Sequence, residues 1–161
     1  MLTDSGGSSV RPELVEGWTE GFSTASNSAE NYSHLGNFLV WAGQPEKAIG
    51  LIEKAMRLNP RYPIRYVLTL GSAYTHVGRY EEAMAAIKKF LAVSPNFGPA
   101  HFHLAICYAE SGRMEEARAE VAEVLRLQPY MTTEWLRQNG TYGDRALLER
   151  HIAALRKAGL K

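Results

Sequence analysis

The sequence predicts an all-α protein: an α-α superhelix of three helix-turn-helix repeats with a C-terminal capping helix. Two observations carry this prediction. A set of residue types recurs three times along the chain, first after 35 residues and then after 34, and each copy contains apolar residues at helical spacing. The 161 residues, 45% of them hydrophobic, fit one folded unit with a core. We place the repeats at 28–60, 61–95 and 96–129.

Seven positions recur with matched chemistry in the three copies. The first copy has Leu35, Gly36, Leu39, Gly43, Ala48, Ile52 and Pro60; the second has Leu70, Gly71, Tyr74, Gly78, Ala83, Ile87 and Pro95; the third has Leu104, Ala105, Tyr108, Gly112, Ala117, Val121 and Pro129. This recurrence over more than half of the chain indicates one structural unit used three times.

Each recurring position has a physical reason in a two-helix hairpin. The small residues Gly36 and Gly71 fall where two antiparallel helices approach each other most closely. The next glycine, Gly43 in the first copy, suits a left-handed residue that ends the first helix. Acidic residues then open the second helix, as in PEKA, YEEA and MEEA, where they complement the helix dipole. A proline such as Pro60 ends that helix, because it lacks an N–H group.

Residues 29–129 resemble three consecutive tetratricopeptide repeat (TPR) units. The best agreement lies at Tyr32, Leu35, Gly36, Leu39, Ala48, Ile52, Ala55 and Pro60. The resemblance implies a right-handed TPR solenoid whose first helices line a concave groove for a partner protein. Three residues depart from the family pattern, because His101 replaces an aromatic residue, and Phe90 and Val124 replace alanine. We expect looser or adjusted stacking of the second and third units there.

The resemblance also indicates which side chains would face a peptide or helix of a partner in the groove. These are the outward positions of the three first helices. The expected partner-binding residues are His34, Asn37, Val40, Trp41, Arg65, Leu68, Thr69, Ser72, His76, Phe102, His103 and Ile106. Such apolar residues can equally pack between units or be covered by the chain's own N-terminal segment.

The charged clamp by which some TPR proteins hold an acidic C-terminal peptide is missing. Asn37 matches one clamp position, but Ser33, Thr69, Pro99 and His103 stand where the clamp has Lys, Asn, Lys and Arg. A carboxylate needs charged donors to offset its desolvation, so a chaperone-tail ligand is disfavoured.

The two ends of the chain differ from the repeats. Residues 1–27 are rich in Gly and Ser and resemble translated bacterial intergenic repeat DNA, so we expect most of them to be disordered, with a short helix through Leu14, Val15, Trp18 and Phe22 as the alternative. Residues 130–161 form the expected capping region, with a short helix through Trp135 and Leu136 and a terminal helix that begins at Asp144 and carries Leu148, Ile152 and Leu155. This tail resembles TPR regions attached to bacterial class III nucleotide cyclase or winged-helix regulator proteins.

Other classes of function find little support in the sequence. A net charge of +1 attracts neither nucleic acid nor a membrane surface, and no apolar run is long enough to span a bilayer. The five histidines lack ligand spacing, so we expect no metal and no other cofactor, although His34, His76 and His103 can converge in the groove. Cys107 has the setting of an inert buried thiol.

The sequence therefore predicts a protein-protein interaction module without enzymatic activity, a regulatory or scaffold remnant of a bacterial signalling protein. A cytoplasmic location fits a chain with one cysteine. The alternative is a self-associating structural protein, a homodimer formed through end faces or groove with no peptide ligand.

Overall fold

The structure is a computed structural model that describes residues 28–140 and 142–161. Within this part of the chain there are eight α-helices and no strand, as the sequence predicts. The expectations for residues 1–27 lie outside the described residues. Thr141 also lies outside them.

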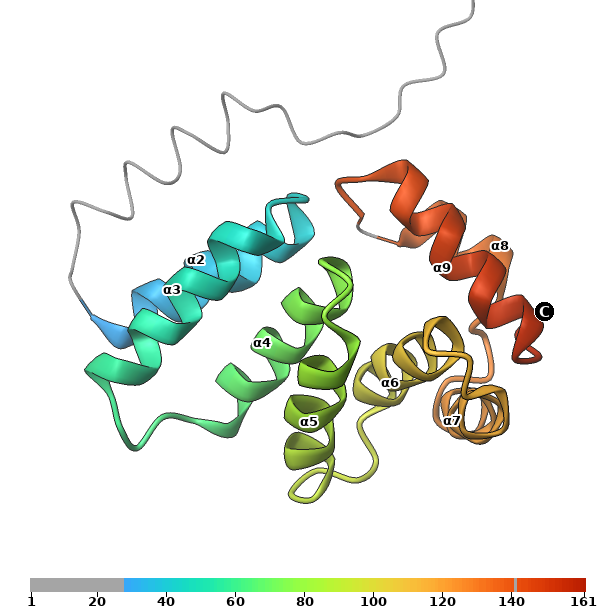
Figure 1. Ribbon diagram of the computed structural model, residues 1–161, viewed down its shortest axis with the longest axis horizontal. Coiled ribbons are helices and arrows are strands. Elements are labelled where there is room, and N and C mark those ends of the chain that lie inside the picture. The colour runs from blue at the N-terminus through green and yellow to red at the C-terminus, as the bar shows by residue number, and fades with distance from the viewer. Residues whose placement is uncertain (1–27, 141) are drawn as a thin grey trace, which may run out of the picture.

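Six helices form three hairpins that follow one another along the chain (Figure 1). Their bounds are α2 Ala29–Trp41 with α3 Pro45–Leu58, α4 Ile64–His76 with α5 Tyr80–Leu91, and α6 Gly98–Glu110 with α7 Met114–Leu127. Each hairpin packs its own two helices together, and α3 packs on α4 as α5 packs on α6. The first helices α2, α4 and α6 also contact one another in order, which makes a continuous stack.

The glycine that follows each first helix has the predicted left-handed conformation. The φ angles are 74° at Gly43, 76° at Gly78 and 75° at Gly112. Other residue types rarely adopt this conformation, since their Cβ meets the following carbonyl group. The glycines therefore keep each turn to a few residues and fix the second helix antiparallel to the first.

The small residues of the first helices mark close helix contacts, as predicted. A Cβ atom on Gly36 would lie 2.5 Å from Cδ1 of Ile52, and one on Gly71 would lie 2.7 Å from Cγ1 of Ile87. An isoleucine from the second helix thus packs directly against each glycine. Ala48 is fully buried beside the first of these contacts.

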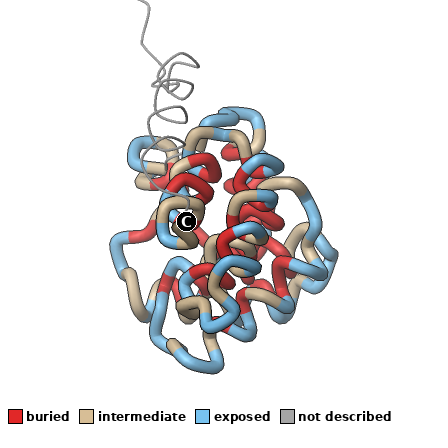
Figure 2. The backbone as a smooth tube through the Cα atoms, turned by 90° about the vertical axis from the view of Figure 1, so that its left-hand side faces the viewer, coloured by how far each residue is buried: buried red, intermediate tan, exposed pale blue. Residues whose placement is uncertain are grey.

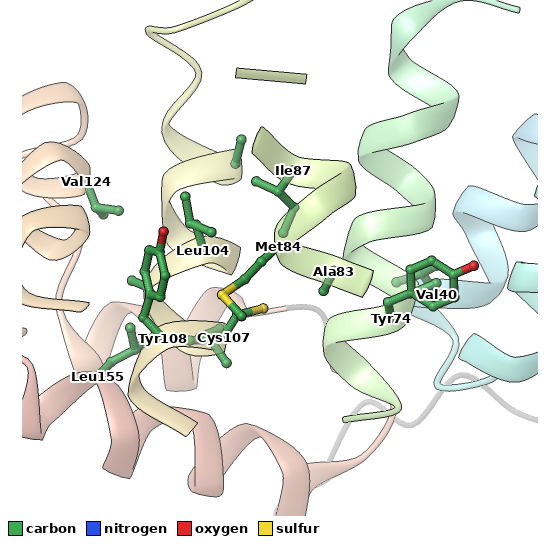
Figure 3. Packing of buried hydrophobic residues seen from close by; sticks show 14 of the residues in the cluster. Val40, Tyr74, Ala83, Met84, Ile87, Leu104, Cys107, Tyr108, Val124 and Leu155 are labelled. Carbon is green, nitrogen blue, oxygen red and sulfur yellow. The ribbon is translucent and has the colours of Figure 1, made fainter. Parts of the chain in front are cut away.

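The buried residues gather along the inner faces of the helices (Figure 2) and join neighbouring hairpins. Figure 3 shows Met84 of the second hairpin among Leu104, Cys107 and Tyr108 of the third. The two positions where the family prefers alanine also lie in this core, since Phe90 and Val124 are both buried. The interior therefore accommodates both larger side chains.

The tail forms two helices close to the predicted positions, α8 Thr133–Asn139 and α9 Arg145–Lys157. Leu148, Ile152 and Leu155 of α9 are buried, in agreement with their spacing. α9 packs against α6, α7 and α8.

The tail covers more than the end of the stack, which the sequence did not predict. Its loop before α9 returns to the turn of the first hairpin, where a Cβ atom on Gly143 would lie 2.5 Å from the backbone nitrogen of Gly43. Arg150 reaches the other two hairpins, with Nε 3.1 Å from Oε1 of Glu110 and Nη2 3.1 Å from the hydroxyl of Tyr80. The tail thus crosses the C-terminal ends of α2, α4 and α6, and Figure 1 shows α8 and α9 facing the first hairpin across these ends.

The start of α9 offers a first test of the fold. The Asp144 carboxylate accepts hydrogen bonds from the backbone N–H groups of Ala146, at 2.8 Å, and Leu147, at 3.2 Å. We expect Asp144→Ala to lower the free energy of unfolding by about 1 kcal/mol, because these N–H groups lose their acceptor. Chemical denaturation of the variant checks this value; an unchanged midpoint would contradict the role of the cap.

Candidate partner-binding groove

Eight of the twelve predicted groove residues keep part of their surface open. His34, Asn37, Trp41 and Arg65 are exposed, and Leu68, Thr69, His76 and Phe102 are half-buried. Trp41 stands out, because a side chain of this size is 42% exposed at the end of α2. An exposed tryptophan on a groove surface is typical of residues that anchor a partner.

The other four predicted residues are buried: Val40, Ser72, His103 and Ile106. The expectation that they are open to a partner is therefore corrected. Two causes act together, since neighbouring first helices pack side by side and the tail covers the ends of these helices. Ser72 and His103 illustrate the first cause, because Oγ of Ser72 lies 3.0 Å from Nε2 of His103 across the contact between α4 and α6.

The exposed side chains at the start of the groove neutralise one another. Glu30 pairs with Arg65 of the next first helix and also lies 3.3 Å from Nε2 of His34. This rim therefore offers a partner polar contacts without a strong net field.

Three histidines meet beneath the tail, although not the three that the sequence suggested. The ring of His76 lies 5.8 Å from that of His103 and 6.0 Å from that of His151, which belongs to α9. Tyr142 closes the group, with its ring 5.0 Å from His76 and its hydroxyl 3.1 Å from Nδ1 of His151. His34 lies apart, on the exposed rim beside Glu30.

Burial keeps these three histidines neutral near pH 7. Desolvation lowers the pKa of His76 to about 4 and that of His151 to about 3, and the pKa of His103 also lies well below its usual value. Both ring nitrogens of His76 lack a hydrogen-bond partner among the described residues. Throughout residues 28–140 and 142–161, no group of three or more His, Cys, Asp or Glu side chains is arranged to hold a metal ion.

A pocket of about 170 Å³ opens between the repeats and the tail. We call it the composite pocket. Its repeat side includes four predicted groove residues, Trp41, His76, Phe102 and His103, together with Pro99 and Gln128. The phenyl ring of Phe102 meets the His103 ring at a tilted angle with centroids 5.5 Å apart, so the wall is a packed set of rings.

The tail forms the other side of the composite pocket. Four of its lining side chains are Met131 from the segment after the third unit, Trp135 and Leu136 from α8, and Tyr142 from the loop before α9. None of these four side chains is among the predicted groove residues. No Asp, Glu, Lys or Arg lines the pocket on either side.

Two further residues that suggested chemistry have structural contacts instead. His101 lies between two acceptors, with Nδ1 2.6 Å from Glu120 and Nε2 2.7 Å from the carbonyl oxygen of Pro95, so it ties the inter-unit turn to α7. Burial raises the pKa of the Cys107 thiol to about 11, and its sulfur lies 3.4 Å from Oγ1 of Thr75. A thiol held protonated is a poor nucleophile.

Comparison with known proteins agrees with this architecture. The family model described as tetratricopeptide repeat matches residues 74–129. No curated protein sequence matches the chain significantly. In the part of the chain that the structure covers, no helix combines the length and apolarity required to cross a bilayer.

Several solved structures share the fold. MamA is 19% identical, with 89% of this chain and 84% of that chain covered and a TM-score of 0.61. The Arabidopsis OM64 TPR domain is 21% identical, with coverage of 81% and 95% and a TM-score of 0.58. The first TPR of Spaghetti (RPAP3), bound to the HSP90 peptide SRMEEVD, is 19% identical, with coverage of 83% and 94% and a TM-score of 0.59. The chain therefore has the TPR solenoid fold, and its residues 74–129 match the tetratricopeptide repeat family.

Proposed function

We propose that this protein binds a segment of a partner protein on the concave side of its three hairpins, next to the composite pocket. The observation that carries the proposal is that the exposed Trp41 and the half-buried Phe102 both line one apolar pocket. Large aromatic side chains in such positions supply most of the binding energy in many protein interfaces. The peptide-bound TPR neighbour supports this use of the fold.

The partner segment is uncharged where it meets the groove. The exposed rim is paired within itself through Glu30 and Arg65, and the clamp for an acidic C-terminus is missing. Ser33 and His103, which stand at two of the clamp positions, are buried. An acidic tail such as the one bound to the Spaghetti domain would therefore lose its water without gaining charged donors.

The biological role that we propose is that of a non-enzymatic adaptor in the cytoplasm, a regulatory or scaffold remnant of a bacterial signalling protein. The resemblance of the tail to TPR regions of cyclase and winged-helix regulators supports this role. The single cysteine supports the compartment.

Two alanine substitutions test the groove. We expect Trp41→Ala with Phe102→Ala to weaken partner binding by tenfold or more, since truncating an interface anchor costs about 2 kcal/mol. Affinity capture from a lysate of the source organism, followed by titration with the captured partner, measures the loss. Helicity is expected to stay nearly unchanged.

The matched control is Leu58→Ala with Val93→Ala. These side chains are also large, apolar and exposed, but they lie at the ends of second helices, away from the pocket. Equal losses of partner binding in the two double variants would show that the partner binds exposed apolar surface non-specifically and not the groove.

A further inference from the structure

The tail of this protein has a second role besides covering the last hairpin. Half of the residues that line the composite pocket belong to the tail, and the others belong to α2, α4 and α6, with Gln128 at the end of α7. Without the tail, Trp41 and Phe102 would lie on an open surface. The shape of the pocket therefore depends on how the tail is held against the repeats.

A close contact between two backbone turns sets the position of the loop before α9. At Gly143, a Cβ atom would lie 2.5 Å from the nitrogen of Gly43 and 2.6 Å from the carbonyl carbon of Ala42. These are backbone atoms, which cannot rotate away as the end of a side chain can. Any residue larger than glycine at position 143 must displace the loop that carries Tyr142.

The dimensions and lining of the pocket define what it can hold. An apolar cavity of about 150 Å³ accommodates a benzene ring, so 170 Å³ takes one ring or one large side chain. Four of the residues that line it are aromatic: Trp41, Phe102, Trp135 and Tyr142. Edge-to-face contacts with these rings favour an aromatic guest over an aliphatic one of equal size.

The electrostatic environment excludes a charged guest. No ionised side chain lines the pocket, and His76 and His103 are neutral near pH 7 because burial lowers their pKa values. A carboxylate or ammonium group would be desolvated there without a counter-charge.

The surface beside the pocket can bind the residues that flank a bound side chain, so it favours a side chain that belongs to a longer segment. Asn37 lies one helical turn before Trp41 on the same face of α2, and both are exposed. The residues that flank a bound side chain can therefore lie along this face, where the paired Glu30 and Arg65 leave no strong field.

We infer that the composite pocket receives one uncharged aromatic side chain of a partner segment, and that it does so only while Gly143 holds the tail against Gly43. This inference rests on the proposed function, since it names the anchor of the partner segment. It adds a requirement on the partner, an exposed phenylalanine or a similar ring, and makes the tail part of the binding site.

The test uses the full chain and three small probes: the N-acetyl amides of phenylalanine, leucine and glutamate. Binding is followed by the NMR signals of the indole N–H groups of Trp41 and Trp135. We expect the phenylalanine probe to shift both signals and to bind about threefold to tenfold more tightly than the leucine probe. The glutamate probe is expected to leave both signals in place.

A matched pair of variants tests the tail. Gly143→Val is expected to weaken binding of the phenylalanine probe at least tenfold. Gly50→Val is expected to leave it unchanged, because a Cβ atom at Gly50 meets nothing within 4 Å. Circular dichroism of Gly143→Val is expected to show that the hairpins remain helical.

Three results would overturn the inference: no shift of the two indole signals, equal binding of the leucine probe, or unchanged binding by Gly143→Val. A fourth result would show that the partner segment is not the natural occupant of the pocket. If Trp18→Ser with Phe22→Ser strengthens probe binding more than threefold, the chain's own N-terminal segment competes for the pocket and the partner segment is not its natural guest.

Failure here is distinguishable from failure of the proposed function. The probes bind or fail to bind without any partner protein. A partner that is captured through Trp41 and Phe102 while the probes fail would leave the proposed function standing and remove the pocket as its anchor site.

Discussion

Gly71→Leu is expected to destabilise the stack by about 3 kcal/mol and to lower Tm by roughly 10 °C. A Cβ atom at this position would lie 2.7 Å from Cγ1 of Ile87 and 3.3 Å from Cβ of Ala86. The leucine side chain fits only if α4 and α5 move apart. Both helices also pack against the neighbouring hairpins. Thermal unfolding followed by circular dichroism measures the effect.

Gly50→Leu is the control for this substitution. It replaces a helical glycine in α3 by the same residue, but into open space at an exposed position. Because leucine has a higher helix propensity than glycine, this variant is expected to be at least as stable as the original chain. If both variants lost the same amount of stability, close packing of α4 on α5 would not be the cause.

Mild acid is expected to destabilise the protein strongly between pH 7 and pH 5. The folded state holds His76, His103 and His151 neutral, with pKa values of about 4 for His76 and about 3 for His151, whereas histidine in the unfolded chain titrates near pH 6.5. Below that pH the unfolded chain binds more protons, so the free energy of unfolding falls as the pH falls. For His76 and His151 this loss is about 2 kcal/mol each between pH 7 and pH 5, and His103 changes the free energy of unfolding in the same direction.

His76→Phe tests the assignment of this loss. The variant removes a ring whose two nitrogens are shielded and unpartnered among the described residues. We expect it to be more stable than the original chain at pH 5 and to depend less steeply on pH. Urea denaturation at pH 7, 6 and 5 measures both slopes, and identical slopes would show that His76 does not contribute to the acid sensitivity.

The repeat architecture was predictable because its determinants recur. Gly43, Gly78 and Gly112 each follow a first helix, and one comparison along the chain finds all three. Asp144 and the apolar spacing of α9 were equally readable, since helix caps and helix faces are local features.

The position of the tail was not predictable in this way. The contact between Gly43 and Gly143 joins residues far apart in the sequence and occurs once, so no repeated pattern marks it. It depends on how far the curved stack brings its first turn toward its last helix. The pocket walls that come from Trp135 and Tyr142 were missed for the same reason.

The burial of one histidine of the cluster, His151, can be predicted from the sequence. His151 lies three residues after Leu148 and four before Leu155, so it falls on the buried face of α9. A histidine on an apolar helix face signals either a buried polar contact or a site. His151 was counted among the five histidines without ligand spacing, but its closeness to His76 and His103 was not predicted.

Site-specific crosslinking tests the proposed binding groove most directly. A photoreactive p-benzoylphenylalanine replaces Asn37, exposed on α2 in the groove, or Arg118, exposed on the second helix α7, and each variant is irradiated in a lysate of the source organism. Binding in the groove predicts one partner protein crosslinked at position 37, absent at position 118, and displaced by an excess of the original chain but not of the Trp41→Ala, Phe102→Ala variant. Equal crosslinking at both positions, or a second copy of this chain as the sole product at position 37, would contradict it.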